Sequence, residues 1–305
     1  MADTINIALV GYGYWGKIWE KVLTRQSCFD FRYIYTPRLL PQGKHTNSLE
    51  KLTDSTIDAL IICTPVHTHH ALTQFFLEHE KHILCEKPLT LCSKQASHLG
   101  KLAMEKGLVL ESNYTYLHSP TIQKMKAELS SLGEIHAMET QIDGFGNFYL
   151  DQDVYSVHCP HVIALTLDLF PDKIFEVSTD DLVFSRQGTV DVGIIKMRSK
   201  NLIVHHHSSL RGIKKERKIV IYGSQGVMEY DATSEEQYKV KYYTENGHQL
   251  IEKTSAQAHF DETKNINLSL EKFYRAITKQ EKANIDLSIR VSSVLEQLTS
   301  KIRRN

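Results

Sequence analysis

The sequence predicts an α/β protein with an N-terminal doubly wound parallel sheet and a C-terminal α+β domain built on an open, mainly antiparallel sheet. In the first third of the chain, short apolar runs alternate with helical stretches, as in a parallel sheet covered on both faces. From about Gly133 onward, longer segments alternate apolar and polar residues with period two. A length of 305 residues suits two domains. We place their boundary near residues 117–120, which gives domains 1–118 and 119–305.

The N-terminal elements follow in the order strand, helix, strand. The strands are expected as near-continuous apolar runs and the helices as amphipathic stretches between them. The expected strands are Ile5 to Val10, Phe31 to Tyr35, Ala59 to Cys63, His82 to Cys85 and Leu108 to Glu111. The expected helices are Trp15 to Leu23, Thr68 to Glu80 and Ser93 to Lys106.

The C-terminal elements are expected to be strands with a few helices. Turn signals such as Gly223-Ser-Gln-Gly226 separate them. The expected strands are Glu134 to Gln141, Lys173 to Thr179, Asp191 to Lys196, Leu202 to Ser208, Arg217 to Tyr222 and Tyr238 to Thr244. Helices are expected near residues 159–170, 264–278 and 286–303.

The charge balance excludes several classes of partner. Thirty-six Lys and Arg are matched by thirty-six Asp and Glu. Binding to nucleic acid or to an anionic membrane usually needs a basic surplus, so we expect neither. Five cysteines without a C-x-x-C pair indicate reduced thiols, and the longest apolar run is far shorter than the roughly 20 residues of a membrane span. We therefore expect a cytoplasmic protein.

A glycine motif lies between the first strand and the first helix, in the hexapeptide Gly11-Tyr12-Gly13-Tyr14-Trp15-Gly16. The G-x-G-x-x-G pattern in this position is typical of the Rossmann dinucleotide site. The first glycine permits a tight turn, the second allows the pyrophosphate to approach the backbone, and the third allows close packing of helix and strand. The sequence therefore predicts an NAD(P)-binding Rossmann domain.

The residues after the second strand bear on the choice between NAD and NADP. An NAD enzyme would place an acid here against the ribose 2′-hydroxyl, whereas this chain has Thr36 and Arg38. A hydroxyl and a guanidinium would hold a 2′-phosphate, so NADP is slightly favoured. Alternatively, Arg38 is a solvated residue that stacks on adenine, which leaves the preference open.

Polar residues and prolines end two consecutive strands. Cys63-Thr64-Pro65, with Thr68-His69 after it, ends one strand, and Glu86-Lys87-Pro88 ends the next. Ligands bind at the carboxyl ends of parallel strands, next to the point where the strand order reverses. Packing alone does not explain these residue types, so we expect a ligand site here.

The glycine motif, T-P-x-x-T-H and E-K-P at these spacings resemble the glucose-fructose oxidoreductase and inositol dehydrogenase family (Gfo/Idh/MocA). Residues 113–120, 133–135 and 223–226 also fall where that family has related segments. The resemblance implies a nicotinamide-dependent oxidoreductase of sugars, nucleotide sugars or cyclitols. It also implies that Lys87 orients the substrate or relays a proton, that Glu86 supports it electrostatically, and that Asn113 and Tyr116 line the nicotinamide pocket. A buried lysine can share protons because burial lowers its pKa.

The family commonly carries Asp-x-x-x-His on the first helix of the second domain, and His161 matches this histidine. The resemblance makes His161 the acid or base toward the reacting hydroxyl, but the aspartate position is Val157. Three explanations remain open: Asp153 or Tyr155 takes the vacant role, His161 and Lys87 suffice, or the protein has lost turnover. His158, three residues before His161, is a further candidate for the substrate site.

Other polar clusters carry less weight. His205 and His207 share a face of a predicted strand, but no acid or cysteine nearby in sequence completes a metal site, so no metal is expected. The basic run 214–218 is typical of a solvated loop, although it could receive a diphosphate. An open sheet would expose one face, which together with the resemblance predicts a homo-oligomer, either a dimer or a tetramer.

The sequence thus predicts an NAD(P)-dependent oxidoreductase acting on a CH–OH group of a small carbohydrate. Residues 1–118 would bind the cofactor, and residues 119–305 would bind the substrate and form the oligomer. One alternative is a non-catalytic dinucleotide-binding regulatory protein, which the valine at position 157 suggests. Another is a reductase of an imine or a conjugated bond, for which the missing aspartate is less surprising.

Overall fold

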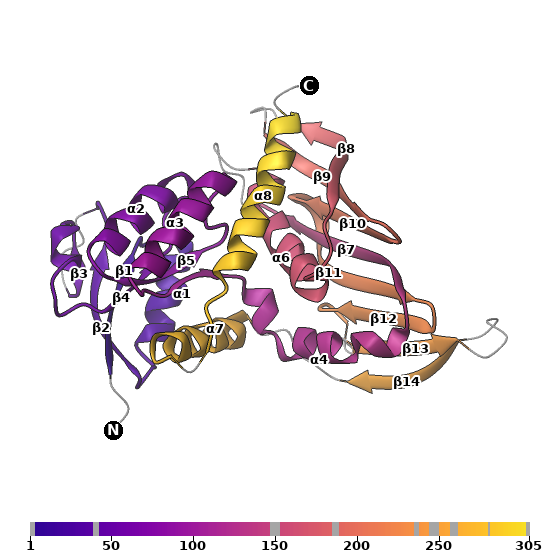
Figure 1. The fold of residues 1–305 in the computed structure, drawn as a ribbon, viewed down its shortest axis with the longest axis horizontal. Coiled ribbons are helices and arrows are strands. Elements are labelled where there is room, and N and C mark those ends of the chain that lie inside the picture. Colours follow the sequence, from indigo (N-terminus) through magenta and orange to yellow (C-terminus); the bar gives the residue numbers. More distant parts are fainter. Residues whose placement is uncertain are drawn as a thin grey trace. The chain divides into compact units, whose positions relative to one another are not determined.

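A computed structural model describes residues 4–38, 43–146, 153–184, 189–234, 238–243, 250–256, 262–279 and 281–302. The chain divides into two compact units (Figure 1). The first unit comprises Met1–Thr115 with Glu262–Ser293, and the second comprises Tyr116–Asp261 with Val294–Asn305.

The first unit contains a six-stranded sheet in the order β3-β2-β1-β4-β5-β6, and all its paired strands are parallel. The strands are β1 (Ile5–Val10), β2 (Phe29–Tyr35), β3 (His45–Thr46), β4 (Ala59–Ile62), β5 (His82–Glu86) and β6 (Leu110–Asn113). The helices between them are α1 (Tyr14–Leu23), η1 (Glu50–Leu52), α2 (Val66–Glu78) and α3 (Ser93–Glu105). The strand order reverses at β1, which lies in the middle of the sheet and pairs with both β2 and β4.

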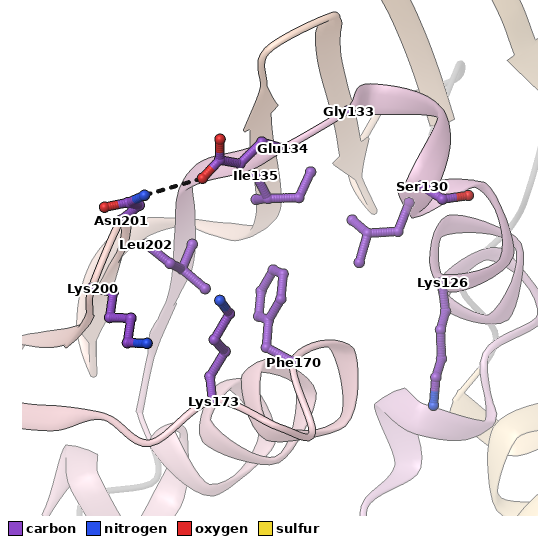
Figure 2. Close-up of a pocket in the computed structure, with 11 residues that line it drawn as sticks. Lys126, Ser130, Gly133, Glu134, Ile135, Phe170, Lys173, Lys200, Asn201 and Leu202 are labelled. Atoms are coloured by element: carbon purple, nitrogen blue, oxygen red, sulfur yellow. Dashed lines mark hydrogen bonds between the residues drawn. The ribbon is translucent and has the colours of Figure 1, made fainter.

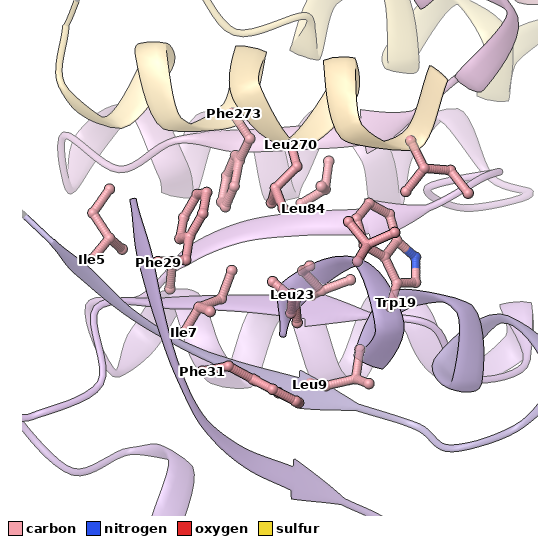
Figure 3. Close-up of a cluster of buried hydrophobic side chains, with 14 of the residues drawn as sticks. Ile5, Ile7, Leu9, Trp19, Leu23, Phe29, Phe31, Leu84, Leu270 and Phe273 are labelled. Atoms are coloured by element: carbon pink, nitrogen blue, oxygen red, sulfur yellow. The ribbon is translucent and has the colours of Figure 1, made fainter. Parts of the chain in front are cut away.

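Side chains alternate between two cores on the two faces of this sheet, because successive residues of a strand point to opposite faces. Ile7 and Leu9 of β1 join one cluster, together with Trp19 of α1 and Phe273 of helix α7, which spans Glu262–Ile277 (Figure 3). Ala8 and Val10 join a second cluster, which includes side chains of α2 and α3. Burial on both faces explains the near-continuous apolar strands in the sequence.

The last two helices correct the expected domain assignment. The sequence placed residues 119–305 in one domain, but α7 (Glu262–Ile277) and the first half of α8 (Ile285–Ile302) group with the first unit. Leu270 and Phe273 of α7 pack in the first core. Asn284 pairs with the backbone of the edge strand β6, with its Oδ1 3.3 Å from the Ser112 amide and its Nδ2 3.2 Å from the Ser112 carbonyl. An exposed edge strand needs such a cover.

The second unit contains an eight-stranded sheet in the order β14-β13-β12-β11-β7-β10-β9-β8. Only β7 and β10 pair in parallel, and the other neighbours are antiparallel. The strands are β7 (Ile135–Phe145), β8 (Glu176–Phe184), β9 (Val190–Ser199), β10 (Leu202–Ser209), β11 (Arg211–Gly223), β12 (Gly226–Asp231), β13 (Tyr238–Tyr243) and β14 (Leu250–Ala256). The helical segments are η2 (Thr115–His118), α4 (Pro120–Glu128), η3 (Leu129–Leu132), α5 (Val154–Val157) and α6 (Cys159–Leu169).

One face of this sheet is buried and the other is open. On β7, Met138 and Ile142 are buried, whereas Glu139 between them is exposed. Helix α6 is buried along nearly its whole length, from Cys159 to Leu169. The predicted fold class, a doubly wound parallel sheet followed by a mainly antiparallel α+β unit, is therefore confirmed. The sequence missed α4, β3, β12 and β14. Within the described ranges, no helix combines the length and the apolar character needed to cross a membrane.

Candidate functional site

The glycine loop joins β1 to α1, and its three glycines differ in what surrounds them. Gly11 has φ +105°, and a Cβ there would lie 2.9 Å from the Cys63 carbonyl oxygen. A Cβ on Gly16 would lie 2.4 Å from the Gly11 carbonyl oxygen, so any side chain would push the helix from the strand. A Cβ on Gly13 would meet nothing within 4 Å. Two glycines thus serve close packing, and the third leaves open space beside the backbone.

The start of helix α1 fits a bound phosphate. Gly13 is its N-cap residue, and among the described residues no side chain caps the helix. The first amides of a helix have no partner within the helix and favour an anion. The open space at Gly13 and the uncapped helix end together match the loop of a dinucleotide site, as the sequence predicts.

The aromatic residues of the motif lie around this loop. Tyr12 donates a hydrogen bond of 2.5 Å to Glu20, and this bond raises the pKa of the tyrosine. The Tyr12 ring also meets His45 of β3 edge to face, with 4.9 Å between ring centroids. Tyr14 is exposed and packs edge to face on Trp15 at 5.6 Å. Tyr12 therefore ties the loop to its own helix and to the end of the sheet.

The end of β2 carries the two residues expected near the ribose. Thr36 is buried, and its hydroxyl lies 3.4 Å from the backbone amide of Arg38. The Arg38 side chain is exposed. The threonine therefore shapes the turn, and the guanidinium is available to solvent or to a ligand.

The residues that follow β4 contact the glycine loop. The Cys63 thiol lies 3.2 Å from the Gly11 carbonyl oxygen and 3.4 Å from that of Val10. Burial raises the pKa of this thiol well above its usual range, so it stays protonated and can donate. The hydroxyl groups of Thr64 and Thr68 form a hydrogen bond of 2.6 Å. Pro65 is the N-cap residue of α2. Cys63 holds the loop through its side chain.

His69 connects the two strand ends. It is buried, with Nδ1 2.9 Å from the Pro88 carbonyl oxygen and Nε2 2.8 Å from the Thr64 carbonyl oxygen. Burial lowers its pKa. A neutral imidazole has one donor and so donates to only one of these carbonyls at a time. His69 therefore fixes the position of the E-K-P segment relative to β4.

A buried carboxyl group lies at the end of β5. Glu86 Oε1 accepts hydrogen bonds from Trp19 Nε1 at 2.9 Å and from Asn113 Nδ2 at 2.8 Å. Burial raises the pKa of Glu86, although these bonds and the charge of Lys87 oppose the shift. The residue is thus a meeting point of α1, β5 and β6. Trp19 has no motif that marks it in the sequence, and its role emerges only from the structure.

Two further groups surround Glu86. The backbone amide of Lys87 lies 3.3 Å from Glu86 Oε2, and the Lys87–Pro88 peptide is cis. The Oδ1 atom of Asn113 is buried and has no hydrogen-bond partner among the residues described here. A buried acceptor without a partner is costly unless something else satisfies it. Asn113 therefore suits a donor group of a ligand.

In the second unit, the segment expected to contain one helix has two. Helix α5 ends at Val157, His158 forms a turn, and α6 begins at Cys159. The backbone amide of His161 bonds to the His158 carbonyl oxygen at 3.2 Å. Val157 and His161 thus belong to different helices, and the spacing of the family motif crosses a break.

Asp153 and Tyr155, the two candidates for the vacant aspartate role, both have structural partners. Asp153 caps α5, with its Oδ1 3.0 Å from the Ser156 amide, and Ser156 Oγ reaches back to the Asp153 amide at 3.1 Å. Tyr155 is fully buried, and its hydroxyl lies 2.6 Å from that of Thr179. The structure therefore gives both side chains a local role in the fold of the second unit.

The candidate acid–base residue His161 lies in a stack of planar groups. Its ring lies against Tyr116 at 4.6 Å between centroids, with an interplanar angle of 16°. The guanidinium carbon of Arg217 lies over the same Tyr116 ring at 5.8 Å. Tyr230 is buried and interacts electrostatically with Tyr116 and Arg217, and its hydroxyl has no hydrogen-bond partner within the described part of the chain. These four side chains form what we call the Tyr116 cluster.

Arg217 was expected in a solvated basic run, and the structure explains why it is not. Strand β11 includes it, and Arg217 shares a face with Ile219 and Ile221, which are buried. Residues 212–215 form the bulge of this strand opposite β7, where Lys214 and Lys215 are exposed. The alternation Arg217, Ile219, Ile221 was the signal in the sequence that could have found this residue.

His158 and His207 lie near a second acid, Asp143. His207 Nδ1 is 3.2 Å from Asp143 Oδ1, and Gln141 donates to Asp143 Oδ2 at 2.6 Å. Burial acts to raise the pKa of Asp143, but the bonds from His207 and Gln141 outweigh it and lower the pKa; His158 adds to the lowering. The hydrogen bond to Asp143 raises the pKa of His207.

His206 lies on the buried face of β10, between its two neighbouring histidines. Its Nδ1 is 2.6 Å from Thr140 Oγ1, and its Nε2 is 3.1 Å from Thr166 Oγ1. Thr166 donates to the Val162 carbonyl oxygen, so it accepts from Nε2–H of the ring. Burial lowers the pKa of His206 to about 3. Over the described segments, no group of three or more His, Cys, Asp or Glu side chains is arranged to hold a metal ion.

The strand–glycine loop–helix geometry defines a dinucleotide-binding α/β protein, and comparison with known proteins agrees. Residues 5–114 match the model of an oxidoreductase family with an NAD-binding Rossmann fold. The N-terminal part of the chain therefore matches this family, the Gfo/Idh/MocA oxidoreductases, as the motifs predict.

Individual relatives and solved structures extend this comparison. The chain is 25% identical over 254 residues to the uncharacterized oxidoreductase YdgJ of Escherichia coli (strain K12), covering 74% of this chain and 71% of that protein. It is 29% identical over 116 residues to the scyllo-inositol 2-dehydrogenase (NADP(+)) IolW of Bacillus subtilis (strain 168), covering 35% of this chain and 32% of that enzyme. The structure of GenD2 from gentamicin A biosynthesis, in complex with NAD, shares the fold with a TM-score of 0.85 at 17% identity, covering 99% of this chain and 95% of that one.

Proposed function

We propose that the protein is an NAD(P)-dependent oxidoreductase that exchanges a hydride between nicotinamide and a secondary alcohol or ketone of a sugar or nucleotide sugar. The observation that carries this proposal is the combination at the strand ends of the first unit. There, an open glycine loop precedes an uncapped helix, and a buried carboxyl lies beside Lys87. The names of the relatives, which include an inositol dehydrogenase, support a carbohydrate substrate.

The residues of the first unit suit a dinucleotide. Gly11, Gly13 and Gly16 with the first amides of α1 would hold the diphosphate. Arg38 would approach the ribose, and Asn113 offers a buried acceptor to the nicotinamide amide. When bound, the nicotinamide supplies or accepts the hydride.

Two side chains would serve the substrate. We assign Lys87 the role of orienting the substrate oxygen with its ammonium group, supported by the buried Glu86. We assign His161 the exchange of the proton, since a neutral imidazole takes a proton from a hydroxyl and an imidazolium returns it. Tyr116 would hold the His161 ring by stacking, and Arg217 would provide a positive charge over the Tyr116 ring. That charge favours a phosphorylated substrate such as a nucleotide sugar.

We propose a slight preference for NADP from the residues at the end of β2. The guanidinium of Arg38 is exposed, and position 36, where an NAD enzyme would carry an acid, is a threonine. Both features favour the 2′-phosphate of NADP. Replacing Arg38 by Gln should weaken NADPH binding by about tenfold, the usual effect of one charge-assisted hydrogen bond, and leave NADH binding nearly unchanged. Equal losses for both cofactors would remove the preference for NADP.

A homo-oligomer, either a dimer or a tetramer, is also proposed. The open face of the eight-stranded sheet carries the half-exposed apolar side chains of Ile194, Ile203 and Val220. Neighbouring antiparallel and parallel strands place them on one surface, which a second copy would cover. Sedimentation equilibrium tests this proposal, and a monomer at all concentrations would contradict it.

Cofactor binding can be tested through the fluorescence of the tryptophans in α1. We expect saturable quenching on titration with NADPH or NADH. Gly13→Ala should weaken binding at least tenfold because its methyl group enters the space beside the loop. Gly144→Ala is the matched control, since its Cβ would also meet nothing within 4 Å but lies on β7. Absence of saturable binding, or equal effects of the two variants, would contradict the proposal.

A second candidate function is a regulatory protein that binds the dinucleotide without turnover. Val157 favours it, because a valine neither relays a proton nor binds a sugar hydroxyl, and Asp153 and Tyr155 have other partners. A third reading, reduction of an imine or a conjugated bond, needs no such aspartate. Single-turnover assays across a sugar panel separate these cases: cofactor that binds and is never consumed, with Val157→Asp changing nothing, supports the regulatory protein.

A further inference from the structure

A cavity of about 450 Å³ lies in the second unit, lined by the segment from α4 to the start of β7, by the residues after α6, and by the turn between β9 and β10 (Figure 2). Within the described residues, no side chain in its lining has a buried polar atom that lacks a hydrogen-bond partner. Asn113, at the end of β6 in the first unit, has such an atom. A buried acceptor of this kind marks a place where a ligand can complete a set of bonds. The end of β6 therefore indicates a ligand contact, and this cavity does not.

The direction of the Asn113 amide is set by Glu86. Asn113 Nδ2 donates to Glu86 Oε1 at 2.8 Å, so Asn113 Oδ1 lies on the other side of the amide. Turning the amide over would place two oxygen atoms, both acceptors, against each other. Both side chains are buried, so water does not replace the lost bond. Glu86 therefore keeps the unpartnered acceptor of Asn113 pointing away from itself.

Glu86 is in turn held by Trp19. Trp19 Nε1 lies 2.9 Å from Glu86 Oε1, the same oxygen to which Asn113 donates. An indole N–H only donates, so this oxygen must remain an acceptor. Trp19 is fully buried in the apolar cluster of the first unit, and Figure 3 shows its ring at one end of that cluster. Packing therefore fixes the indole, and the indole fixes the carboxyl oxygen.

The need of a buried indole for an acceptor does not explain why that acceptor is a carboxyl group. A backbone carbonyl would satisfy the indole equally well. Burial raises the pKa of Glu86, which means that the ionised carboxylate is destabilised in this place. The second oxygen, Oε2, lies 3.3 Å from the Lys87 amide. A group that is costly to bury, and that bonds to residues of α1 and β6 from the end of β5, makes this junction rigid.

The junction lies on the nicotinamide side of the strand order. The order reverses at β1, and the adenosine ribose of a dinucleotide binds at the end of β2, on one side of this point. Strands β5 and β6, which end at Glu86 and Asn113, lie on the other side. A dinucleotide that crosses the switch point places its nicotinamide there. The carboxamide of nicotinamide carries an NH₂ group, a donor that suits the Oδ1 atom of Asn113.

We propose that Trp19 is a positioning residue of the cofactor site. Its indole holds Glu86, Glu86 holds the Asn113 amide, and Asn113 Oδ1 accepts a hydrogen bond from the nicotinamide carboxamide. Helix α1 begins at the glycine loop, so the same helix positions the diphosphate at its first turn and the nicotinamide through Trp19. This inference rests on the proposed binding of a dinucleotide, but not on hydride transfer to a carbohydrate.

Two pairs of ligands test the proposal: NADH with ADP-ribose, and NADPH with 2′-phospho-ADP-ribose. The members of each pair differ only in the nicotinamide, and calorimetric titration of the full-length protein measures their Kd values. Trp19→Phe keeps an aromatic ring but removes the donor. It should raise the Kd of NADH and NADPH about three- to tenfold, the effect of one hydrogen bond, and leave the other two Kd values unchanged. Phe273→Leu, in the same apolar cluster, is the matched control and should change neither ratio.

A double substitution tests whether Trp19 acts through Asn113. Asn113→Ala should raise the Kd of NADH and NADPH at least as much as Trp19→Phe does, and combining the two should add little. If Trp19→Phe does not fold, Asn113→Ala decides by itself.

Three results would overturn the proposal: equal weakening of both members of a pair by Trp19→Phe, unchanged ratios in Asn113→Ala, or losses that multiply in the double variant. The predicted ratios in a protein that consumes no cofactor with any sugar would contradict the proposed function alone.

Discussion

The glycine loop of the first unit and the Tyr116 cluster of the second unit hold their functional groups in different ways. In the loop, backbone atoms approach so closely that Gly16 tolerates no Cβ, and the thiol of Cys63 bonds to loop carbonyls. In the cluster, side chain packs on side chain, as Tyr116 does on His161. Sites built from backbone require fixed residue types, whereas sites built from side chains tolerate exchange.

The sharpest test of this difference is a pair of alanine substitutions in the loop. Gly16→Ala places a Cβ 2.4 Å from a backbone oxygen and should cost about 3 kcal/mol or more of unfolding free energy. Gly13→Ala should cost under about 1 kcal/mol, because nothing lies within 4 Å. Urea denaturation measures both. If Gly16→Ala were as stable as the parent, the close approach of helix and strand would not be required.

The next effect concerns the buried His206 in the second unit. Its pKa is about 3 in the folded protein and about 6.5 when unfolded. As the pH falls below 6.5, the unfolded state takes up a proton that the folded state does not, so stability decreases. At 1.36 kcal/mol per pH unit, the loss between pH 7 and pH 4 is about 3 kcal/mol.

His206→Gln can still bond to both threonine hydroxyls but does not titrate. The unfolding free energy of the variant, taken relative to that of the parent, should therefore increase by about 3 kcal/mol as the pH falls from 7 to 4. Unfolding free energies from urea titrations at several pH values measure this difference. A constant difference across the range would mean that His206 does not remain neutral.

A smaller effect is expected from the stack on His161. Tyr116→Leu removes the ring, and Tyr116→Phe keeps it. Aromatic pairs contribute about 0.5 to 1.5 kcal/mol, so the leucine variant should lose about three- to tenfold in the rate of the proposed reaction. The phenylalanine variant should lose less, and both should bind cofactor normally. Equal losses in the two variants would show that the hydroxyl, rather than the ring, is what matters.

The smallest effect is expected at the pair Asp143 and His207. Because the pKa of His207 is raised in the folded protein, its protonation stabilises the fold at pH values below the unfolded-state pKa of about 6.5. This stabilisation is lost as the pH rises through the pKa of the folded state. Because the pKa of Asp143 is lowered in the folded protein, its ionisation stabilises the fold at pH values above the unfolded-state pKa of about 3.8. This stabilisation is lost as the pH falls through the pKa of the folded state. Asp143→Asn should thus cost under about 1 kcal/mol, mainly between pH 4 and 6.5, because His207 is 40% exposed. A cost that persists at pH 9 would have another origin.

The same difference explains what could be predicted from the sequence. The glycine loop and the E-K-P strand end were predictable because each is encoded by a short segment with fixed residue spacing. The strands of the first unit were predictable because burial on both faces makes them apolar throughout. Trp19 and Tyr230 could not be predicted, because their partners are distant in the sequence. Helix α7 was placed in the wrong domain because an amphipathic pattern does not say which sheet the helix covers.

The break between α5 and α6 was equally hidden. His158 and His161 lie three residues apart but not in one helix, because His158 forms the turn between two helices. The capping box of Asp153 and Ser156 starts the first of these helices, and its pattern is short enough to be overlooked. Turns of this kind depend on side-chain bonds that periodicity does not report.

We propose that the protein transfers a hydride to or from a carbohydrate. The most direct measurement is single-turnover oxidation of NADPH and NADH by the purified protein with a panel of keto-sugars, ketocyclitols and nucleotide keto-sugars. We predict consumption of the reduced cofactor with at least one member of the panel. Lys87→Met and His161→Leu should lower that rate about a hundredfold while cofactor binding persists. Cofactor that binds but is not consumed with any member, in the parent and in Val157→Asp, would contradict the account.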